Sequence, residues 1–203
     1  MFKFEDLSID TGKAGDFFKV TPEPTIKGIV DVIFSQPNFE QGPWIAGGMA
    51  RQLVLGETDF NDIDVWFSSQ RQLDLIRSRL SEVYGSRVWM EHSSNNAETF
   101  DVGGFKVQLI KKKFFSSLDE IFDGFDFTCC QLAVDKNLQI YGPGKQDAAD
   151  RRLRVHRLNK DSFLARYAKY VGYGYSMPNE EFLDWINKTH DINYKFDGAA
   201  FGY

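Results

Sequence analysis

The sequence lacks the features that mark secreted, membrane-spanning or nucleic-acid-coating proteins. Only two of its 203 residues are cysteines, and no apolar run approaches the roughly 20 residues that a membrane span needs. The N-terminal residues MFKFEDLSID have no basic start followed by an apolar stretch, so we expect no signal peptide. The net charge of −5 argues against a protein that coats nucleic acid without sequence preference.

The two cysteines, Cys129 and Cys130, are adjacent inside an apolar run. We expect this run to be extended, so that the two side chains point to opposite faces and a disulfide between them would be strained. Reduced thiols and a cytoplasmic protein without a membrane partner follow from this interpretation.

The remaining composition is that of an ordinary globular protein, with 42% hydrophobic and 26% charged residues and no internal repeat. The length allows one sizeable domain with a small appendage. Helical spacing of apolar residues and short alternating runs predict an α+β fold. The predicted helices are 26–34, 49–55, 70–82, 118–122, 163–171 and 180–187, and the predicted strands are 44–46, 62–67, 87–90, 99–102 and 105–110. A further apolar element is predicted at 127–134.

We interpret residues 1–141 as a head domain in which a mixed β-sheet is flanked by helices. Residues 142–203, where polar and basic residues mix with apolar ones at helical spacing, are interpreted as a small helical neck or tail.

Two carboxylates on the predicted strand 62–67 are the first candidate for chemistry. A period of two places Asp62 and Asp64 on one face, while Ile63, Val65 and Phe67 face the core. Two close carboxylates on a buried strand repel each other and lose hydration, so they need a compensating charge. Oxygen ligands of this kind suit Mg²⁺, or Mn²⁺. Two solvated aspartates at a strand end are the simpler alternative.

A glycine pair precedes these aspartates. Gly47 and Gly48 end the strand 44–46 and open the next helix. Glycines at such a turn allow backbone N–H groups to approach phosphates closely. Arg51, in the first turns of that helix, would then touch a phosphate or clamp an aspartate.

Residues 44–67, WIAGGMARQLVLGETDFNDIDVWF, resemble the signature of the tRNA nucleotidyltransferase (CCA-adding) and bacterial poly(A) polymerase family, within the polymerase-beta nucleotidyltransferase superfamily. Three later segments are similar to further motifs of that family, in the same order. They are FDFTCCQLAVD, YGPGKQDAADRRLRV and SFLARYAKYVGYGY. The likeness spans about residues 44–175 and implies a nucleotidyltransferase head domain.

The resemblance implies a role for each matching residue. Asp62 and Asp64 would be the catalytic, metal-binding carboxylates. A nucleoside triphosphate, ATP or CTP, would be bound by Gly47, Gly48, Arg51, Asp126, Arg166 and Lys169.

The sequence also departs from the family. Its third carboxylate is replaced by Gln108, an amide that can offer a metal only a neutral oxygen. Gly124 and Phe125 stand where the family has paired arginines, and the first neck arginine is lost near Phe163. The chain to Tyr203 leaves little room for the helical body that holds tRNA in the family.

Three functions remain open. The first is nucleotidyl transfer from a triphosphate to an acceptor hydroxyl on an RNA 3′ end, a small molecule or a protein, with release of pyrophosphate. The second is a degenerate protein that binds nucleotide or RNA without turnover, and the third is a structural role. We expect RNA to be bound by a basic helix carrying Arg151, Arg152, Arg154 and Arg157. The alternative for these arginines, and for the lysines at 111–113, is that they are ordinary solvated surface residues. The sequence does not indicate the oligomeric state.

Overall fold

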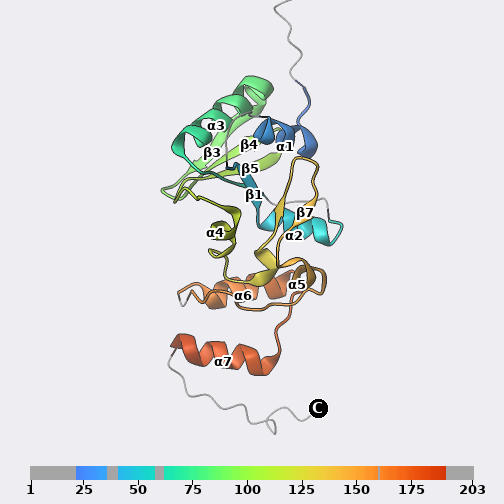
Figure 1. The fold of residues 1–203 in the computed structure, drawn as a ribbon, viewed down its shortest axis with the longest axis vertical. Coiled ribbons are helices and arrows are strands. Elements are labelled where there is room, and N and C mark those ends of the chain that lie inside the picture. Colours follow the sequence, from blue (N-terminus) through green and yellow to red (C-terminus); the bar gives the residue numbers. More distant parts are fainter. Residues whose placement is uncertain (1–21, 36–40, 58–61, 160, 191–203) are drawn as a thin grey trace, which may run out of the picture.

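The computed structural model describes residues 22–35, 41–57, 62–159 and 161–190. A seven-stranded sheet forms the upper part in Figure 1, and two helices, α6 (Phe163–Gly172) and α7 (Asn179–His190), lie below it. This arrangement confirms the predicted α+β class with a mixed sheet, flanking helices and C-terminal helices.

The sheet has the order β3-β4-β5-β2-β1-β6-β7. All neighbouring strands are antiparallel except β2 and β5, which run parallel. The parallel pair lies in the middle of the sheet and carries the candidate site. The strands are β1 (Trp44–Ala46), β2 (Ile63–Trp66), β3 (Val88–Ser93), β4 (Ala97–Val102), β5 (Phe105–Ile110), β6 (Ala133–Val134) and β7 (Ile140–Tyr141).

Alternation along the central strands separates the core from the site. Ile63 and Val65 of β2 and Val107 and Leu109 of β5 are fully or almost fully buried. Each such side chain contributes about 1.5–3 kcal/mol when removed from water. The residues between them face the opposite side of the sheet, so the predicted alternation of buried and less buried residues is observed on both strands.

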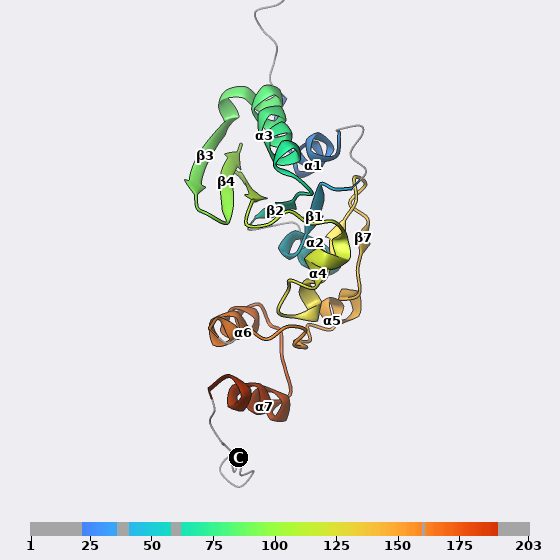
Figure 2. The same ribbon diagram turned by 60° about the vertical axis from the view of Figure 1, so that its left-hand side comes forward.

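Helices α1 (Ile26–Phe34) and α3 (Gln70–Tyr84) lie side by side against the sheet (Figures 1 and 2). Leu73, Ile76 and Leu80 form the buried stripe of α3 at helical spacing. Ser69 caps this helix by accepting a hydrogen bond from the backbone N–H of Gln72 over 3.3 Å. The other short helices are α2 (Gly48–Val54), η3 (Gly85–Arg87), α4 (Leu118–Phe122), η4 (Thr128–Cys130) and α5 (Lys145–Ala149).

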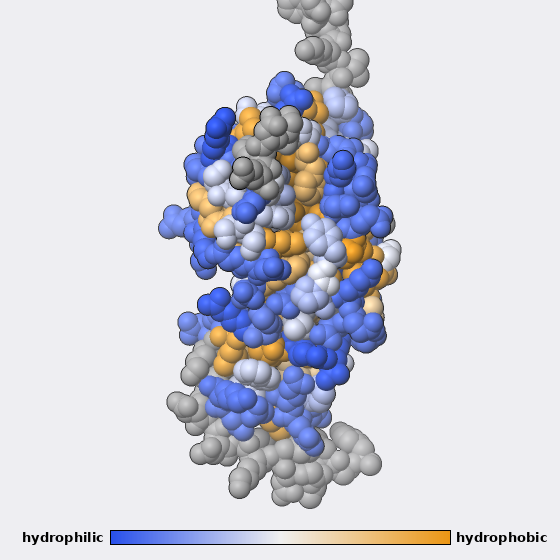
Figure 3. All heavy atoms as spheres, viewed as in Figure 1, coloured by the Kyte–Doolittle hydropathy of each residue, from blue (hydrophilic) through white to orange (hydrophobic). Residues whose placement is uncertain are grey.

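Aromatic side chains join the C-terminal helices to each other and to Phe127 at the start of η4. The rings of Tyr167 in α6 and Phe182 in α7 stack with centroids 4.3 Å apart. Tyr170 of α6 packs edge-on against Phe127, with centroids 5.3 Å apart. Figure 3 shows an apolar patch at the level of these helices and a second over the sheet, within a mostly hydrophilic face.

Two expectations about local structure were wrong. The apolar run 127–134 is not one strand: it turns through η4, with Cys130 N–H donating to the carbonyl of Phe127, before the short strand β6. An apolar run does not distinguish the two because both bury their side chains. Cys129 and Cys130 therefore lie in a turn, with sulfurs 3.9 Å apart, and both are free and buried.

The predicted basic helix over 151–157 is also wrong, because α5 ends at Ala149. Leu153 is buried and Val155 half-buried, with exposed Arg152 and Arg154 alternating with them. This period of two is that of an extended segment, and bridges from Arg152 to Ser176 and from Val155 to Phe127 hold it.

No helix in the described part of the chain is long and apolar enough to cross a membrane.

Candidate functional site

The glycine turn between β1 and α2 forms one wall of the site. Gly47 has φ of +105°, a conformation that side chains rarely adopt, and its N–H donates to the carbonyl of Leu132 over 2.8 Å. Gly48 begins α2. A Cβ added to it would meet only Oδ1 of Asp62, at 3.6 Å, so there is open space beside this residue. The unusual backbone thus belongs to Gly47, and the close approach to the aspartates involves both residues.

The two aspartates face this turn from β2. Asp62 directly precedes the strand and Asp64 lies within it, and both line the same cavity. Burial, with a smaller effect of the Asp62 charge, raises the pKa of Asp64 to about 7, and Lys169 and Arg166 partly oppose this shift. The charged form of Asp64 is therefore disfavoured in the absence of a cation.

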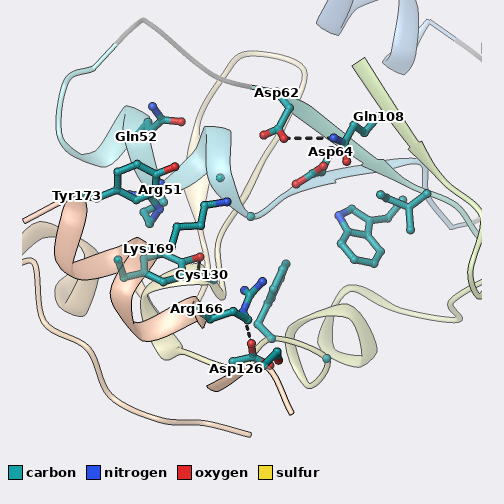
Figure 4. A pocket seen from close by; sticks show the side chains of 18 of the residues that line it. Arg51, Gln52, Asp62, Asp64, Gln108, Asp126, Cys130, Arg166, Lys169 and Tyr173 are labelled. Atoms are coloured by element: carbon teal, nitrogen blue, oxygen red, sulfur yellow. Dashed lines mark hydrogen bonds and ion pairs between the residues drawn. The ribbon is translucent and has the colours of Figure 1, made fainter. Parts of the chain in front are cut away.

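Gln108 lies beside the aspartates on the parallel neighbour β5. It is paired in register with Asp64, and its Nε2 donates to Oδ2 of Asp62 over 3.3 Å. Figure 4 shows this hydrogen bond at the top of the cavity. Among the described residues no group of three His, Cys, Asp or Glu side chains could hold a metal ion. The site thus offers two carboxylates and one amide oxygen.

These groups open into a cavity of about 600 Å³ between the sheet and α6. Arg166 and Lys169, both predicted from the sequence, extend from α6 into it. The cavity is lined by Gly47, Gly48, Arg51, Gln52, Asp62, Asp64, Trp66, Gln108, Ile110, Gly124, Phe125, Asp126, Cys130, Asn159, Ser162, Arg166, Lys169, Tyr170 and Tyr173.

Asp126 lies across the cavity from the aspartates and forms an ion pair with Nε of Arg166 (Figure 4). Burial raises the pKa of Asp126, although Arg166 and Arg157 act in the opposite direction. This pairing places Asp126 with the cationic helix α6, away from the position of a third acid beside Asp62 and Asp64.

Arg51 borders the cavity, but its guanidinium packs among tyrosine rings. The side chain is 5% exposed, and its guanidinium carbon lies 5.4, 5.1 and 5.3 Å from the ring centroids of Tyr170, Tyr173 and Tyr175. A hydrogen bond from Arg51 to the Tyr175 hydroxyl helps to raise the pKa of Arg51, although burial acts against this. Arg51 therefore ties α2 to the C-terminal segment, and among the described residues it forms no ion pair with an aspartate.

Aromatic side chains also line the cavity, and this contribution was not predicted from the sequence. Tyr170 lies in the last turn of α6, Tyr173 is the C-cap residue of this helix, and both line the cavity. A spacing of three residues signals a shared face, but such aromatic stripes most often pack into the core. The Tyr170 hydroxyl lies 2.8 Å from the Cys130 sulfur, so this tyrosine contacts both the core and the cavity. Trp66 was assigned only to the strand, and its Nε1 donates to the carbonyl of Ala46 over 3.2 Å.

The four arginines expected to bind RNA have different surroundings. Arg151 pairs with Glu57 over 3.1 Å and donates to the carbonyl of Tyr173 over 2.5 Å. Arg154 lies 3.4 Å from Asp147. Arg152 is exposed and lines neither of the two cavities described, whereas Arg157 lines a second cavity beside the first.

The fold is that of the tRNA nucleotidyltransferases. The CCA-adding enzyme of Bacillus stearothermophilus in complex with CTP superposes with a TM-score of 0.55 at 18% identity, covering 75% of this chain and 40% of the enzyme. A tRNA nucleotidyltransferase complexed with a primer tRNA and an incoming ATP analogue gives a TM-score of 0.54 at 17% identity, covering 73% of this chain and 46% of that one. At these identities the likeness establishes the fold.

Sequence comparison gives a different family. The chain is 29% identical over 153 residues to Gabija anti-defense 2 of Bacillus phage SPbetaL7, which covers 73% of this chain and 37% of that protein. The chain thus spans well under half the length of the phage protein. Residues 19–145 match the family described as Gabija anti-defense 2 family protein. Since this match includes more than half of the sequence, the chain belongs to the Gabija anti-defense 2 family.

Proposed function

We propose that this protein transfers a nucleoside monophosphate from a triphosphate to an acceptor hydroxyl and releases pyrophosphate. One observation carries the proposal: the Asp62–Asp64 pair, the glycine turn and the cations of α6 all face a single cavity. Binding a triphosphate for transfer requires backbone that can approach the phosphates closely, positively charged side chains, and carboxylates that hold a metal ion. The glycine turn, the cations of α6 and the two aspartates offer these three features.

The donor set fits one magnesium or manganese ion. Burial, together with the neighbouring Asp62 charge, raises the pKa of Asp64, and a cation beside Asp64 would relieve both effects. Magnesium usually takes one or two carboxylates and completes its shell with substrate phosphates and water, so Asp62 and Asp64 suffice to hold it. When bound, the ion neutralises developing charge on the phosphates.

The protein groups contribute position and charge. Gly47 and Gly48 leave room for phosphate oxygens, and Lys169 and Arg166 face the aspartates from α6 with positive charge. The acceptor oxygen would form a bond to the α-phosphorus as the bond from that phosphorus to the pyrophosphate oxygen breaks. The hydroxyl proton would be lost to solvent. Holding the reactants in this order is itself a large part of such catalysis.

Binding without turnover is the second candidate, and Gln108 favours it. An amide beside Asp62 replaces the carboxylate that the related enzymes place there, and it adds no negative charge to hold a metal. The glycine turn and the cations of α6 would still bind a nucleotide.

The phage relative is called Gabija anti-defense 2, and we propose that nucleotidyl transfer by this chain serves a similar anti-defense role. ATP and CTP are the proposed donors, because the structural neighbours were solved with CTP and an ATP analogue. An RNA 3′ end is one proposed acceptor.

Pyrophosphate release tests the proposal. The protein is incubated with Mg²⁺, total cellular RNA and each of the four ribonucleoside triphosphates in turn. We expect release with at least one triphosphate, and a loss of about a thousandfold, or about 4 kcal/mol, in Asp62→Ala and in Asp64→Ala. Asp161→Asn, an exposed carboxylate outside the cavity, is the control. Tight triphosphate binding with no release under any condition would favour the second candidate.

A further inference from the structure

A second cavity of about 700 Å³ adjoins the first. It extends from the site toward α4 and the turn between β3 and β4. The two cavities share a boundary formed by Trp66, Gln108, Ile110, Gly124, Asp126 and Asn159. A molecule in the second cavity would therefore reach the first beside Gln108, which contacts Asp62.

Two basic runs that are distant in the sequence meet in this second cavity. Lys112 and Lys113 come from the segment after β5, and Arg157 from the extended segment after α5. Each run taken alone resembles ordinary solvated surface, but their convergence on one cavity is not explained by solvation. The fold thus concentrates positive charge next to the candidate site.

Part of this charge forms no close ion pair among the described residues, although the charge of Arg157 also acts on Asp126. Lys113 pairs with Glu120, and this ammonium together with hydrogen bonds from Ser116 lowers the pKa of Glu120 to about 2. The other carboxylate of the cavity, Asp126, pairs with Arg166. Across the described residues no ion pair is formed by the remaining two cations, Lys112 and Arg157. Both are exposed and positioned to meet an anion.

Aromatic rings line the same space. Trp66 and Phe115 pack edge to face with centroids 5.4 Å apart. The hydrogen bond from the indole of Trp66 to the Ala46 carbonyl fixes its ring. Rings beside free cations are the combination that binds bases and phosphates of single-stranded nucleic acid or of nucleotides.

Resting on the proposed function, we propose that the second cavity holds the acceptor and that this acceptor is a nucleotide. Its base would pack against Trp66 and Phe115, its phosphate would meet Lys112 and Arg157, and its ribose hydroxyl would face the shared boundary at Gln108. The hydroxyl oxygen would attack the α-phosphorus of the triphosphate in the first cavity, and pyrophosphate would leave. The same chemistry is present in a free mononucleotide and in the terminal nucleotide of an RNA.

Binding measurements test this without requiring turnover. A fluorescein-labelled RNA hexamer with a free 3′ hydroxyl is titrated by anisotropy, and AMP is titrated by calorimetry, each with the full chain. The test variant is Lys112→Ala/Arg157→Ala. The control is Lys136→Ala/Arg71→Ala, which removes the same charges from exposed residues that line neither cavity. Triphosphate affinity is measured in both with a nonhydrolysable ATP analogue.

We expect the test variant to bind hexamer, AMP or both at least tenfold more weakly than the control, with the hexamer losing about two units of salt dependence. Affinity for the ATP analogue should change less than threefold. A loss for AMP alone would identify a free nucleotide as the acceptor, and a loss for the hexamer would identify an RNA end. Trp66→Leu should reproduce the loss, because it removes the ring and keeps the charges.

Equal affinities in the test variant and the control would overturn the proposal. Transfer of the nucleoside monophosphate to a protein, with neither nucleotides nor RNA serving as acceptors, would overturn it as well. Failure of the proposed function has a different signature. In that case the hexamer or AMP would bind in a Lys112- and Arg157-dependent manner, but no pyrophosphate would be released with any acceptor.

Discussion

Gln108 donates its side-chain amide to a carboxylate oxygen of Asp62 over 3.3 Å, from the strand that runs parallel to β2. An amide therefore occupies the position beside the aspartate pair where a third negative charge would bind a metal ion more firmly. This contact makes the replacement of Gln108 the most informative single change at the site.

Gln108→Glu should strengthen metal binding and weaken the metal-free protein. A third carboxylate near Asp62 and Asp64 is repelled without metal, and a bound Mg²⁺ offsets that repulsion. We expect lower thermal stability in chelator and a larger gain from added Mg²⁺ than in the parent. Calorimetric titration with Mg²⁺ and a nonhydrolysable triphosphate measures the affinity, with Gln139→Glu, exposed and outside both cavities, as the control. Unchanged metal affinity would show that Gln108 does not contact the metal.

The raised pKa of Asp64 predicts a specific pH dependence of stability. Because the pKa is about 7 in the folded protein and 3.8 ordinarily, the folded state binds the proton more tightly than the unfolded state. The stabilisation is thus complete below about pH 4 and is lost as pH rises to 7. Asp64→Asn should remove this dependence. Between pH 4 and pH 7 its free energy of unfolding should therefore rise relative to that of the parent by up to about 4 kcal/mol, at about 1.4 kcal/mol per pKa unit.

Urea unfolding in chelator at several pH values between 4 and 8 measures this difference. Asp161→Asn, which removes an exposed carboxylate that does not line the cavity, controls for the loss of one charge. A constant difference between Asp64→Asn and the parent at all pH values would contradict the assigned environment of Asp64.

The two glycines should respond differently to alanine. Gly47→Ala forces a side chain into a φ of +105° and toward the ring of Phe125 at 3.4 Å, so we expect a loss of about 2 kcal/mol of stability. Gly48→Ala meets only Oδ1 of Asp62 at an ordinary 3.6 Å, so stability should be kept. Its methyl group would obstruct phosphates, and we expect about tenfold weaker binding of a nonhydrolysable ATP analogue. Thermal melting and calorimetry separate the two effects, and full affinity in folded Gly48→Ala would remove this turn from the binding site.

Arg51→Lys should destabilise the protein although the charge is kept. The planar guanidinium packs among three tyrosine rings and bonds to the Tyr175 hydroxyl, and an ammonium cannot reproduce this arrangement. We expect a loss of about 2 kcal/mol in urea unfolding. Arg79→Lys, on the exposed side of α3 in a pair with Glu82, should change stability very little. Equal effects of the two substitutions would mean that the tyrosine contacts are not important for stability.

Local patterns were sufficient to predict β1 to β5, but not the two-residue strands β6 and β7. The period of two on β2 and β5 correctly separates Asp64 and Gln108 from the buried Val65 and Leu109. The contact between Gln108 and Asp62 was not predictable in this way, because it requires β5 to pair with β2 in parallel, and nothing local specifies that neighbour.

The residues whose contacts or local structure were predicted wrongly are those that pack against distant parts of the chain. The position of Arg51 on α2 suggested a phosphate or aspartate partner, but Tyr170, Tyr173 and Tyr175 from the C-terminal segment surround its guanidinium. The residues around Arg154 mix polar and basic side chains with apolar ones and were interpreted as a helix, whereas the buried Leu153 and its neighbours follow strand alternation.

Labelled triphosphates test directly whether this chain transfers a nucleoside monophosphate. ATP or CTP carrying label on the α- or, separately, on the γ-phosphate is incubated with the protein, Mg²⁺, AMP and total RNA. Nucleotidyl transfer predicts the α label on an acceptor and the γ label in pyrophosphate, with both signals lost in Asp64→Ala. Label appearing as free phosphate, remaining in the intact triphosphate, or moving equally well in Asp64→Ala would contradict the account.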